Sequence, residues 1–308
     1  MEFASVLPSL RGRDLLSLAD LSREEILGLL ELGERFSRDR REGFGLLNGA
    51  HVGLVFAKPS TRTRVSFEVA VGQLGGRSLY FNAADLQLGR GETIADTGMV
   101  LSGYLEAVVI RTFHHADVVE LARAASIPVI NALTDLTHPC QGLADLLTVR
   151  REKGRLEGLK VAYLGDGNNV AHSLILGGGK VGLEVAVATP AKYRPDAEVL
   201  AGAAGGRVWW TEDPAAAAGG ADVIYTDVWT SMGQEGQEGE RRRLLEPYRV
   251  TEKIMALARP GAIFMHCLPA HRGEEVEAVV LDGSASRVFV QAENRLHVQK
   301  ALLAAILG

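Results

Sequence analysis

The sequence has few of the features that mark secreted or membrane proteins. Cys140 and Cys267 are its only cysteines, too few for the disulfide framework of a small secreted domain. No stretch of about 18 uncharged apolar residues occurs. Residues 1–10 also lack the basic and then apolar segments of a secretion signal. We therefore expect neither export nor membrane insertion, and the reducing cytoplasm is the expected location.

The sequence also has no excess of basic charge. With 33 Lys and Arg against 38 Asp and Glu, its formal net charge is −5, and the electrostatic footprint of a nucleic-acid-binding protein is absent. Small anions must then be bound by local groups of atoms. A length of 308 residues, with 47% of them hydrophobic, suits two domains of ordinary size.

Short β-branched apolar runs alternate with longer stretches of helical period, which is typical of βαβ units around parallel sheets. Strands are predicted at 51–57, 78–81, 107–111, 128–131, 161–164, 184–188, 207–210, 223–225 and 262–266. Helices are predicted near 61–74, 93–103, 116–125, 138–150 and 293–307, and a polar surface loop at 234–243. The pattern predicts an α/β fold of two doubly wound parallel-sheet domains, with the boundary after the helix at 138–150.

A candidate anion site lies where the first predicted strand meets a helix. Residues 57–64 read AKPSTRTR, and the backbone N–H groups and dipole of a helix start converge on one point. Ser60, Thr61 and Thr63 add hydroxyl donors, and Arg62 adds a planar guanidinium suited to phosphate oxygens. A single Ser or Thr here would indicate only a helix cap. The combination favours an oxyanion site, but the Walker spacing of ATP and GTP hydrolases is absent.

A second strand-to-helix junction, GDGNNV at 165–170, superficially resembles a dinucleotide-binding loop. Val170 occupies the third small position, and the next predicted strand ends at 188–190 without the acidic residue that would bind a ribose. NAD is therefore not expected. No metal site is predicted either. Five histidines match no metal-ligand spacing supported by carboxylates or thiols: His114, His115, His172, His271 and His297.

Six separated motifs resemble the aspartate/ornithine carbamoyltransferase family and follow the family's order. They are STRTRVSFE at 60–68, HPCQGLAD at 138–145, GDGNN at 165–169, DVWTSMG at 227–233, HCLP at 266–269 and AENR at 292–295. The resemblance covers the chain from about residue 50 to its end. The first two motifs belong to the whole family, whereas DVWTSMG and HCLP resemble its ornithine branch. Cys267 is the sharpest discriminator between the branches.

The resemblance implies a transferase that moves the carbamoyl group of carbamoyl phosphate to the side-chain amine of L-ornithine, giving L-citrulline and phosphate. This is a step of the arginine-biosynthesis or urea-cycle type. The implied carbamoyl phosphate-binding domain covers 1–148, joined by the C-terminal helix at about 293–308, and the implied ornithine-binding domain covers 149–292. The active site is expected in the cleft between them. The resemblance implies no cofactor and a homo-oligomer, a trimer or a multiple of trimers.

The family's site residues carry over position by position. The catalytic residues implied are Arg62, Arg111, His138, Cys267 and Arg295. The residues implied to contact carbamoyl phosphate are Ser60, Thr61, Arg62, Thr63, Gln87, Arg111, His138, Gln141, Cys267, Leu268 and Arg295. Those implied to bind ornithine are Asn169, Asp227, Ser231 and Met232. Asn169 would bind the α-carboxylate and Asp227 the α-ammonium group, and Gln87 would reach the site from a neighbouring subunit.

Some alternatives stay open from the sequence. Putrescine, N-acetylornithine or aspartate could replace ornithine, because the first domain would be the same for all of them. A catalytically silent carbamoyl phosphate-binding homologue is disfavoured, since every expected polar position is occupied. A nicotinamide dehydrogenase is disfavoured by Val170. Whether Cys267 or phosphate takes the proton of the attacking amine is not decided by the sequence.

Overall fold

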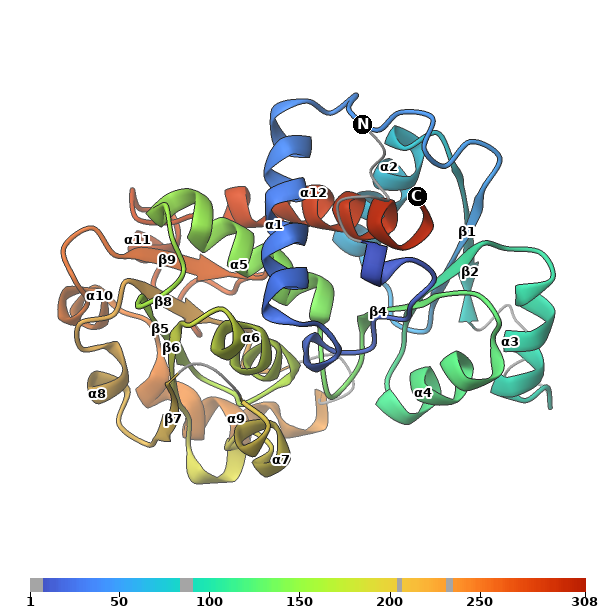
Figure 1. The fold of residues 1–308 in the computed structure, drawn as a ribbon. Coiled ribbons are helices and arrows are strands. Elements are labelled where there is room, and N and C mark those ends of the chain that lie inside the picture. Colours follow the sequence, from blue (N-terminus) through green and yellow to red (C-terminus); the bar gives the residue numbers. More distant parts are fainter. Residues whose placement is uncertain (1–7, 84–90, 204–206, 231–234) are drawn as a thin grey trace. The chain divides into compact units, whose positions relative to one another are not determined.

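The computed structural model describes residues 8–83, 91–203, 207–230 and 235–308. The chain divides into two compact units, Met1–Leu147 with Asn294–Gly308, and Thr148–Glu293. Each unit has its own parallel sheet with helices around it (Figure 1). The division falls within two helices, α5 (Pro139–Lys153) and α12 (Val288–Leu307).

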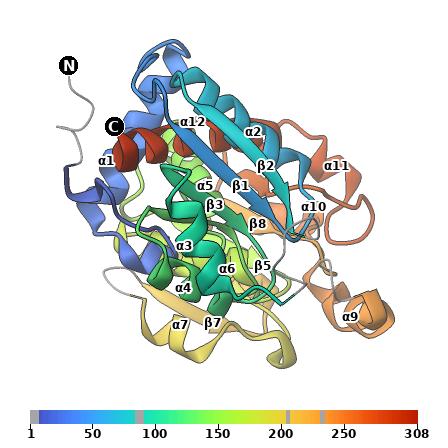
Figure 2. The same cartoon turned by 90° about the vertical axis from the view of Figure 1, so that its right-hand side faces the viewer.

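The first unit contains a four-stranded sheet in the order β2-β1-β3-β4, with every pair parallel. Its strands are β1 (His51–Phe56), β2 (Arg77–Asn82), β3 (Ala107–Arg111) and β4 (Val129–Leu133). Its further helices are α1 (Arg23–Arg38), α2 (Thr61–Gln73), α3 (Ile94–Ser102) and α4 (His115–Ala124). Helix α2 packs against β1 and β2, and α3 and α4 lie on the other side of the sheet (Figure 2).

The interior strands of this sheet, β1 and β3, are almost entirely apolar between His51 and Arg111 because helices cover both faces. In β3, all five residues are buried, and in β1 only His51 is not. A continuous apolar strand of this kind is typical of parallel sheets, whereas a sheet with one wet face alternates apolar and polar residues. The carboxyl ends of β1 and β3 therefore lie at one edge of a sheet that is covered by helices on both faces.

The second unit contains a five-stranded parallel sheet in the order β7-β6-β5-β8-β9. Its strands are β5 (Lys160–Leu164), β6 (Glu184–Ala188), β7 (Val208–Thr211), β8 (Val223–Thr226) and β9 (Ile263–His266). Its helices are α6 (Asn169–Lys180), α7 (Ala197–Ala201), α8 (Pro214–Ala218), α9 (Glu238–Leu245), α10 (Glu252–Leu257) and α11 (Ala278–Leu281). The strand order reverses direction at β5, where open sheets of this kind bind their ligands.

The predicted α/β class and the two parallel sheets are confirmed, and each predicted strand overlaps an observed one. The prediction of a surface loop at 234–243 is wrong in its described part, because α9 covers Glu238–Leu245. Glycine and charge dominate that sequence, yet Arg241 and Leu245, one helical turn apart, are buried on the same face. The last helix also begins earlier than predicted, at Val288. Among the described helices, none is both long and apolar enough to cross a lipid bilayer.

Candidate active site

The junction between β1 and α2 forms the first part of the candidate site. Ser60 is the N-cap of α2, and its Oγ accepts a hydrogen bond from the backbone N–H of Thr63 at 3.2 Å. Thr61 and Arg62 occupy the first turn, where backbone N–H groups have no carbonyl partner within the helix. The Nε of Arg62 is buried and has no hydrogen-bond partner among the residues that the structure describes. The junction therefore offers several donors to an anion.

Two further arginines belong to the same unit as this junction. Arg111 is the last residue of β3, the strand that pairs with β1. Its backbone carbonyl accepts a hydrogen bond from the backbone N–H of Ala57 at 2.8 Å. Arg295 of α12 donates from Nη2 to the Thr63 hydroxyl at 2.6 Å. The two side chains are 8% and 3% exposed. Buried guanidinium groups can donate several hydrogen bonds to an oxyanion in a fixed planar geometry, so this arrangement suits a bound anion.

His138 lies just before α5 and within the influence of both arginines. Burial is the main cause that lowers its pKa well below the usual value, and the charges of Arg295 and Arg111 lower that pKa further. The imidazole is therefore neutral at neutral pH. A neutral imidazole can donate a hydrogen bond to a carbonyl oxygen without carrying a charge.

Gln141 lies in the first turn of α5, and the two polar atoms of its side chain have different surroundings. Its Nε2 donates to the carboxylate of Asp145 at 2.8 Å, and both residues are fully buried. Its Oε1 is buried and has no hydrogen-bond partner within the described part of the chain. Gln141 therefore presents an acceptor, the group that an NH₂ of a ligand requires.

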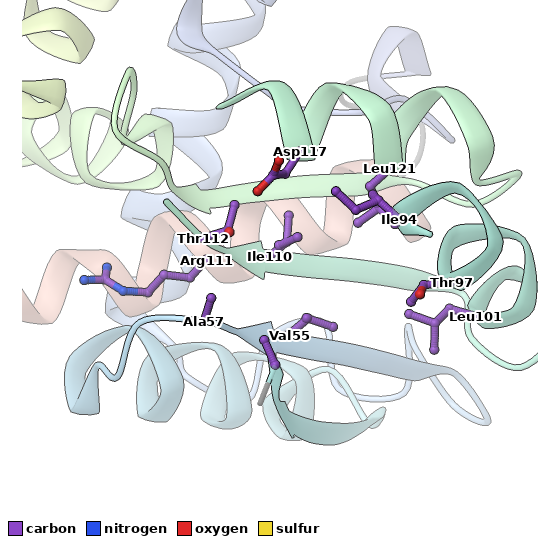
Figure 3. Close-up of a pocket in the computed structure, with 11 residues that line it drawn as sticks. Val55, Ala57, Ile94, Thr97, Leu101, Ile110, Arg111, Thr112, Asp117 and Leu121 are labelled. Carbon is purple, nitrogen blue, oxygen red and sulfur yellow. The ribbon is translucent and has the colours of Figure 1, made fainter. Parts of the chain in front are cut away.

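A pocket of about 310 Å³ opens beside the carboxyl ends of β1 and β3. Apolar side chains line most of it, among them Val55, Ile94 and Leu121. Figure 3 shows that the side chain of Arg111 points away from these residues, beyond the end of β3. The pocket is therefore an apolar hollow behind the arginine, and the guanidinium is directed elsewhere.

The junction between β5 and α6 forms the corresponding part of the second unit. Asn168 is the N-cap of α6, and its Oδ1 accepts from Val170 N at 2.9 Å and Ala171 N at 3.3 Å. Its Nδ2 donates to Asp227 Oδ2 at 2.8 Å, so one amide connects the helix start to the residue after β8. Asn169, the residue predicted from the sequence, is the first residue of the helix and is only partly buried.

Asp227 and Cys267 meet at the carboxyl ends of β8 and β9, which are neighbours in the sheet. The thiol of Cys267 lies 2.9 Å from Asp227 Oδ1. Asp227 is 5% exposed. Leu268, the next residue, has a φ of 58°, a conformation that a non-glycine residue rarely adopts. This backbone turns the chain sharply just after the thiol, which is a form of strain often found at functional sites.

One of the five histidines for which no metal-ligand spacing was found, His271, lies close to two carboxylates. Its ring lies with the carboxylates of Glu274 and Glu275, and all their ligand atoms are within 4.8 Å of one another. Asp227, His266 and Cys267 form a second group of this kind. In that second group, the ring Nδ1 of His266 already accepts from Leu268 N at 2.9 Å. Proximity alone does not make either group a metal centre, because hydrogen bonding also brings such side chains together.

Comparisons with known proteins match two family models to this chain, one to each of its two parts. The model of the aspartate/ornithine carbamoyltransferase carbamoyl-P binding domain matches residues 13–151, and that of the family's Asp/Orn binding domain matches residues 157–306. The chain belongs to the aspartate/ornithine carbamoyltransferase family. The resemblance inferred from its motifs is confirmed, and membership of this family makes the chain a transferase.

Relatives in the family are similar over nearly the whole chain. The ornithine carbamoyltransferase of Oceanobacillus iheyensis is 53% identical, with 97% of this chain and 95% of that protein covered. The anabolic ornithine carbamoyltransferase of Pyrococcus furiosus is also 53% identical, with 97% and 98% covered. The solved structure of the Pyrococcus furiosus enzyme has a TM-score of 0.93 at 53% identity, covering 97% and 98%. That from Thermus thermophilus has 0.89 at 43% identity, covering 96% and 99%.

The structure brings some of the predicted residues into contact and leaves others outside its description. Thr63 meets Arg295, and Asp227 meets Cys267. Gln87, Ser231 and Met232 lie outside the described residues. Asn168 was missed by sequence reasoning. Its signal was present, because an Asn before an apolar helix is a common N-cap, but its contact with Asp227 joins positions far apart in the sequence.

Proposed function

We propose that this chain transfers the carbamoyl group of carbamoyl phosphate to the side-chain amine of L-ornithine, giving L-citrulline and phosphate. Relatives more than 50% identical over nearly the whole chain carry the name ornithine carbamoyltransferase. The contact of Cys267 with Asp227, both in motifs of the ornithine branch, is the observation that carries the proposal. The anabolic relative supports a role in arginine biosynthesis.

In this proposal, the first unit binds carbamoyl phosphate. Ser60, Thr61, Arg62, Thr63 and Arg111 bind the phosphate, since the helix start and the arginines offer donors and positive charge. This charge stabilises the phosphate as the bond between it and the carbamoyl carbon breaks. Most of the acceleration then comes from positioning and electrostatics.

The carbamoyl group is bound by three further residues. His138 and Arg295 donate hydrogen bonds to its carbonyl oxygen, which becomes more negative as the amine attacks. The neutral imidazole of His138 suits this role, because its burial between cations lowers its pKa. Gln141 accepts from the carbamoyl NH₂, and the buried Oε1 that has no partner among described residues supports this role.

The second unit binds the acceptor. Asp227 pairs with the α-ammonium group of ornithine, and Asn169 binds its α-carboxylate, with Ser231 and Met232 as further contacts. Cys267 contacts both substrates, and Leu268 contacts carbamoyl phosphate through its backbone carbonyl. The side-chain nitrogen forms a bond to the carbamoyl carbon, the bond from that carbon to the phosphate oxygen breaks, and phosphate leaves. The proton released from nitrogen passes to the departing phosphate or to the thiolate form of Cys267.

The protein is further proposed to be a cytoplasmic homotrimer or a multiple of trimers. In this assembly, Gln87 contacts carbamoyl phosphate bound by a neighbouring subunit. Sedimentation at assay concentration tests the assembly, and we expect the mass of at least three chains. A monomer with full activity would contradict the sharing of sites between subunits.

A panel of acceptors tests the reaction itself. We expect formation of citrulline from ornithine, and a kcat/KM for putrescine lower by a factor on the order of 10⁴, because sites built for polar partners reject analogues that lack them. N-acetylornithine, which lacks the α-ammonium group, should also be poor. Aspartate should fail because its second carboxylate meets Asp227. Equal use of putrescine or N-acetylornithine would contradict the proposed pocket, although carbamoyl phosphate could still be the donor.

A further inference from the structure

A buried ion pair in the second unit lies outside the residues proposed to contact the acceptor, and it has no part in the proposed reaction. Arg241 of α9 donates from Nη2 to Oδ2 of Asp166, and the two residues are 3% and 8% exposed. Asp166 belongs to the loop between β5 and α6, two residues before the N-cap Asn168. The pair therefore connects the loop that leads into α6 with helix α9.

Arg241 makes two further contacts that fix the segment after Asp227. Its Nε donates to the backbone carbonyl of Trp229 at 2.5 Å, and its guanidinium lies 4.4 Å from the ring centroid of Tyr193. Trp229, Tyr193 and Leu245 form a small buried cluster beneath it. One guanidinium therefore contacts a carboxylate, a carbonyl and an aromatic ring. Few other side chains could make these three contacts at once.

The other side of the Asp166 loop is packed against backbone. Gly167 N donates to the carbonyl of Tyr193 at 2.9 Å. A Cβ at Gly167 would lie only 2.4 Å from Pro195 N, so no side chain fits here. The loop is confined between residues 193–195 and Arg241, and a change in the ion pair has little room to relax by movement of the loop.

Two carboxylates lie close enough in this region to affect one another. Burial raises the pKa of Asp166 to about 6, Arg241 opposes that rise, and the charge of Asp227 adds to it. Asp227 in turn contacts the Cys267 thiol and the Asn168 amide. Without Arg241, and at a pH where Asp166 is ionised, the acceptor's carboxylate would meet the negative charges of two aspartates rather than one, and its ammonium group would meet two competing anions.

We propose that Arg241 is a positioning residue for the acceptor. It neutralises Asp166 and fixes the Trp229 carbonyl, so that Asp227 is the single uncompensated carboxylate that meets the α-ammonium group of ornithine. This inference rests on the proposed function. It assigns specificity to a residue outside the substrate contacts, within the segment where the sequence alone predicted a surface loop.

Three variants test the inference: Arg241→Gln, Asp166→Asn and the double variant. We expect Arg241→Gln to raise KM for ornithine at least 10-fold, while KM for carbamoyl phosphate changes less than 2-fold. The double variant, which buries no uncompensated charge, should recover most of the KM for ornithine. Arg242→Gln is the matched control, because Arg242 is the exposed neighbour in the same helix and should behave as wild type.

The pH dependence separates charge from mere loss of packing. In Arg241→Gln, Asp166 lacks its cation and becomes protonated at higher pH than in the wild type. The ratio of ornithine KM between variant and wild type should therefore fall as the pH is lowered from 8 to 6. The deprotonation of ornithine cancels in this ratio. The groups that face Asp166 are Arg241 and Asp227, and the second is present in both proteins.

Several results would overturn the inference. They are equal losses for both substrates, a loss confined to kcat, a ratio that does not change with pH, or a double variant as poor as Arg241→Gln. Melting temperatures identify misfolding, and if Arg241→Gln does not fold, Asp166→Asn, which leaves the charge of Arg241 uncompensated, should have a higher KM for ornithine than the double variant. A wild type inactive on ornithine would instead overturn the proposed function. In that case, the same variants would be tested with the amino acid that the wild type does accept.

Discussion

The two units share one kind of structural junction and surround it with different charges. In each, the chain leaves an interior parallel strand and enters a helix capped by a polar side chain, Ser60 for α2 and Asn168 for α6. Near the first cap lie Arg62 and Arg295. Near the second lies Asp227, which the cap itself contacts. A helix start favours anions in both cases, and the surrounding charges decide what else binds.

This difference shows how one topology can present different charges to a ligand. The first junction adds cations to a helix start, and so suits a phosphate with two negative charges. The second adds a carboxylate beside the positive end of the α6 dipole, and so suits a ligand that carries both charges. Arg241 keeps this second balance by neutralising Asp166. The fold supplies the junction, and a few side chains from distant parts of the sequence set its charge.

The largest expected effect concerns the cationic junction. Arg62→Ala should lower kcat/KM by a factor on the order of 10³, because it removes a donor directed at charge that develops on the leaving phosphate. Steady-state kinetics with circular dichroism measure activity and fold together. Arg123→Ala, at an exposed arginine of α4 in the same unit, is the control and should have little effect. If Arg62→Ala retained its activity, the phosphate would not bind at this junction, and the comparison between the two junctions would fail.

A smaller effect is expected at the acidic junction. Asp227→Asn keeps the shape of the side chain and removes its charge, so KM for ornithine should rise on the order of 10- to 100-fold, as for loss of a hydrogen bond to a charged group. The dissociation constant of carbamoyl phosphate, measured by calorimetry, should change less than about 2-fold. Glu198→Gln, at an exposed carboxylate of α7, is the control. Weaker carbamoyl phosphate binding in Asp227→Asn would contradict the assignment of one ligand to each junction.

The sequence predicted the strand-to-helix junctions better than the distant residues that contact them. Ser60 and Thr63 could be placed at a helix start because the strand, the cap and the helix are local patterns. The resemblance implied Asn169 as an ornithine contact and assigned no role to its neighbour Asn168, whose capping contacts the structure shows. The contact of Asn168 with Asp227 joins two distant positions, and no local pattern predicts it.

Arg241 escaped prediction for a different reason. Its segment is rich in glycine and charge, which is typical of surface loops. Its burial depends on Asp166 and Trp229, which come from other elements of the same unit. Tertiary contacts of this kind override local propensity, and no pattern within the segment reports them. The sequence therefore predicted the strand-to-helix junctions of the two sheets and missed the buried arginine beside one of them.

The smallest expected effect tests whether the first junction truly keeps its histidine neutral. Because burial and two arginines lower the pKa of His138 in the folded protein, the unfolded chain binds the extra proton first as the pH falls below about 6.5. Stability contributed by neutral His138 is therefore present above that pH and is lost as the pH falls. His138→Gln removes this loss. Between pH 6.5 and 5.5, the wild type should lose about 1 kcal/mol more unfolding free energy than the variant.

Denaturant unfolding at several pH values measures this difference. His114→Gln is the matched control, because His114 belongs to the same unit and its side chain is 75% exposed. It should show the wild-type dependence on pH. If His138→Gln and the wild type lose stability in parallel, then His138 takes up a proton in the folded state within this range. The first junction would then hold one more cation, and its contrast with the acidic junction would be larger than the neutral imidazole implies.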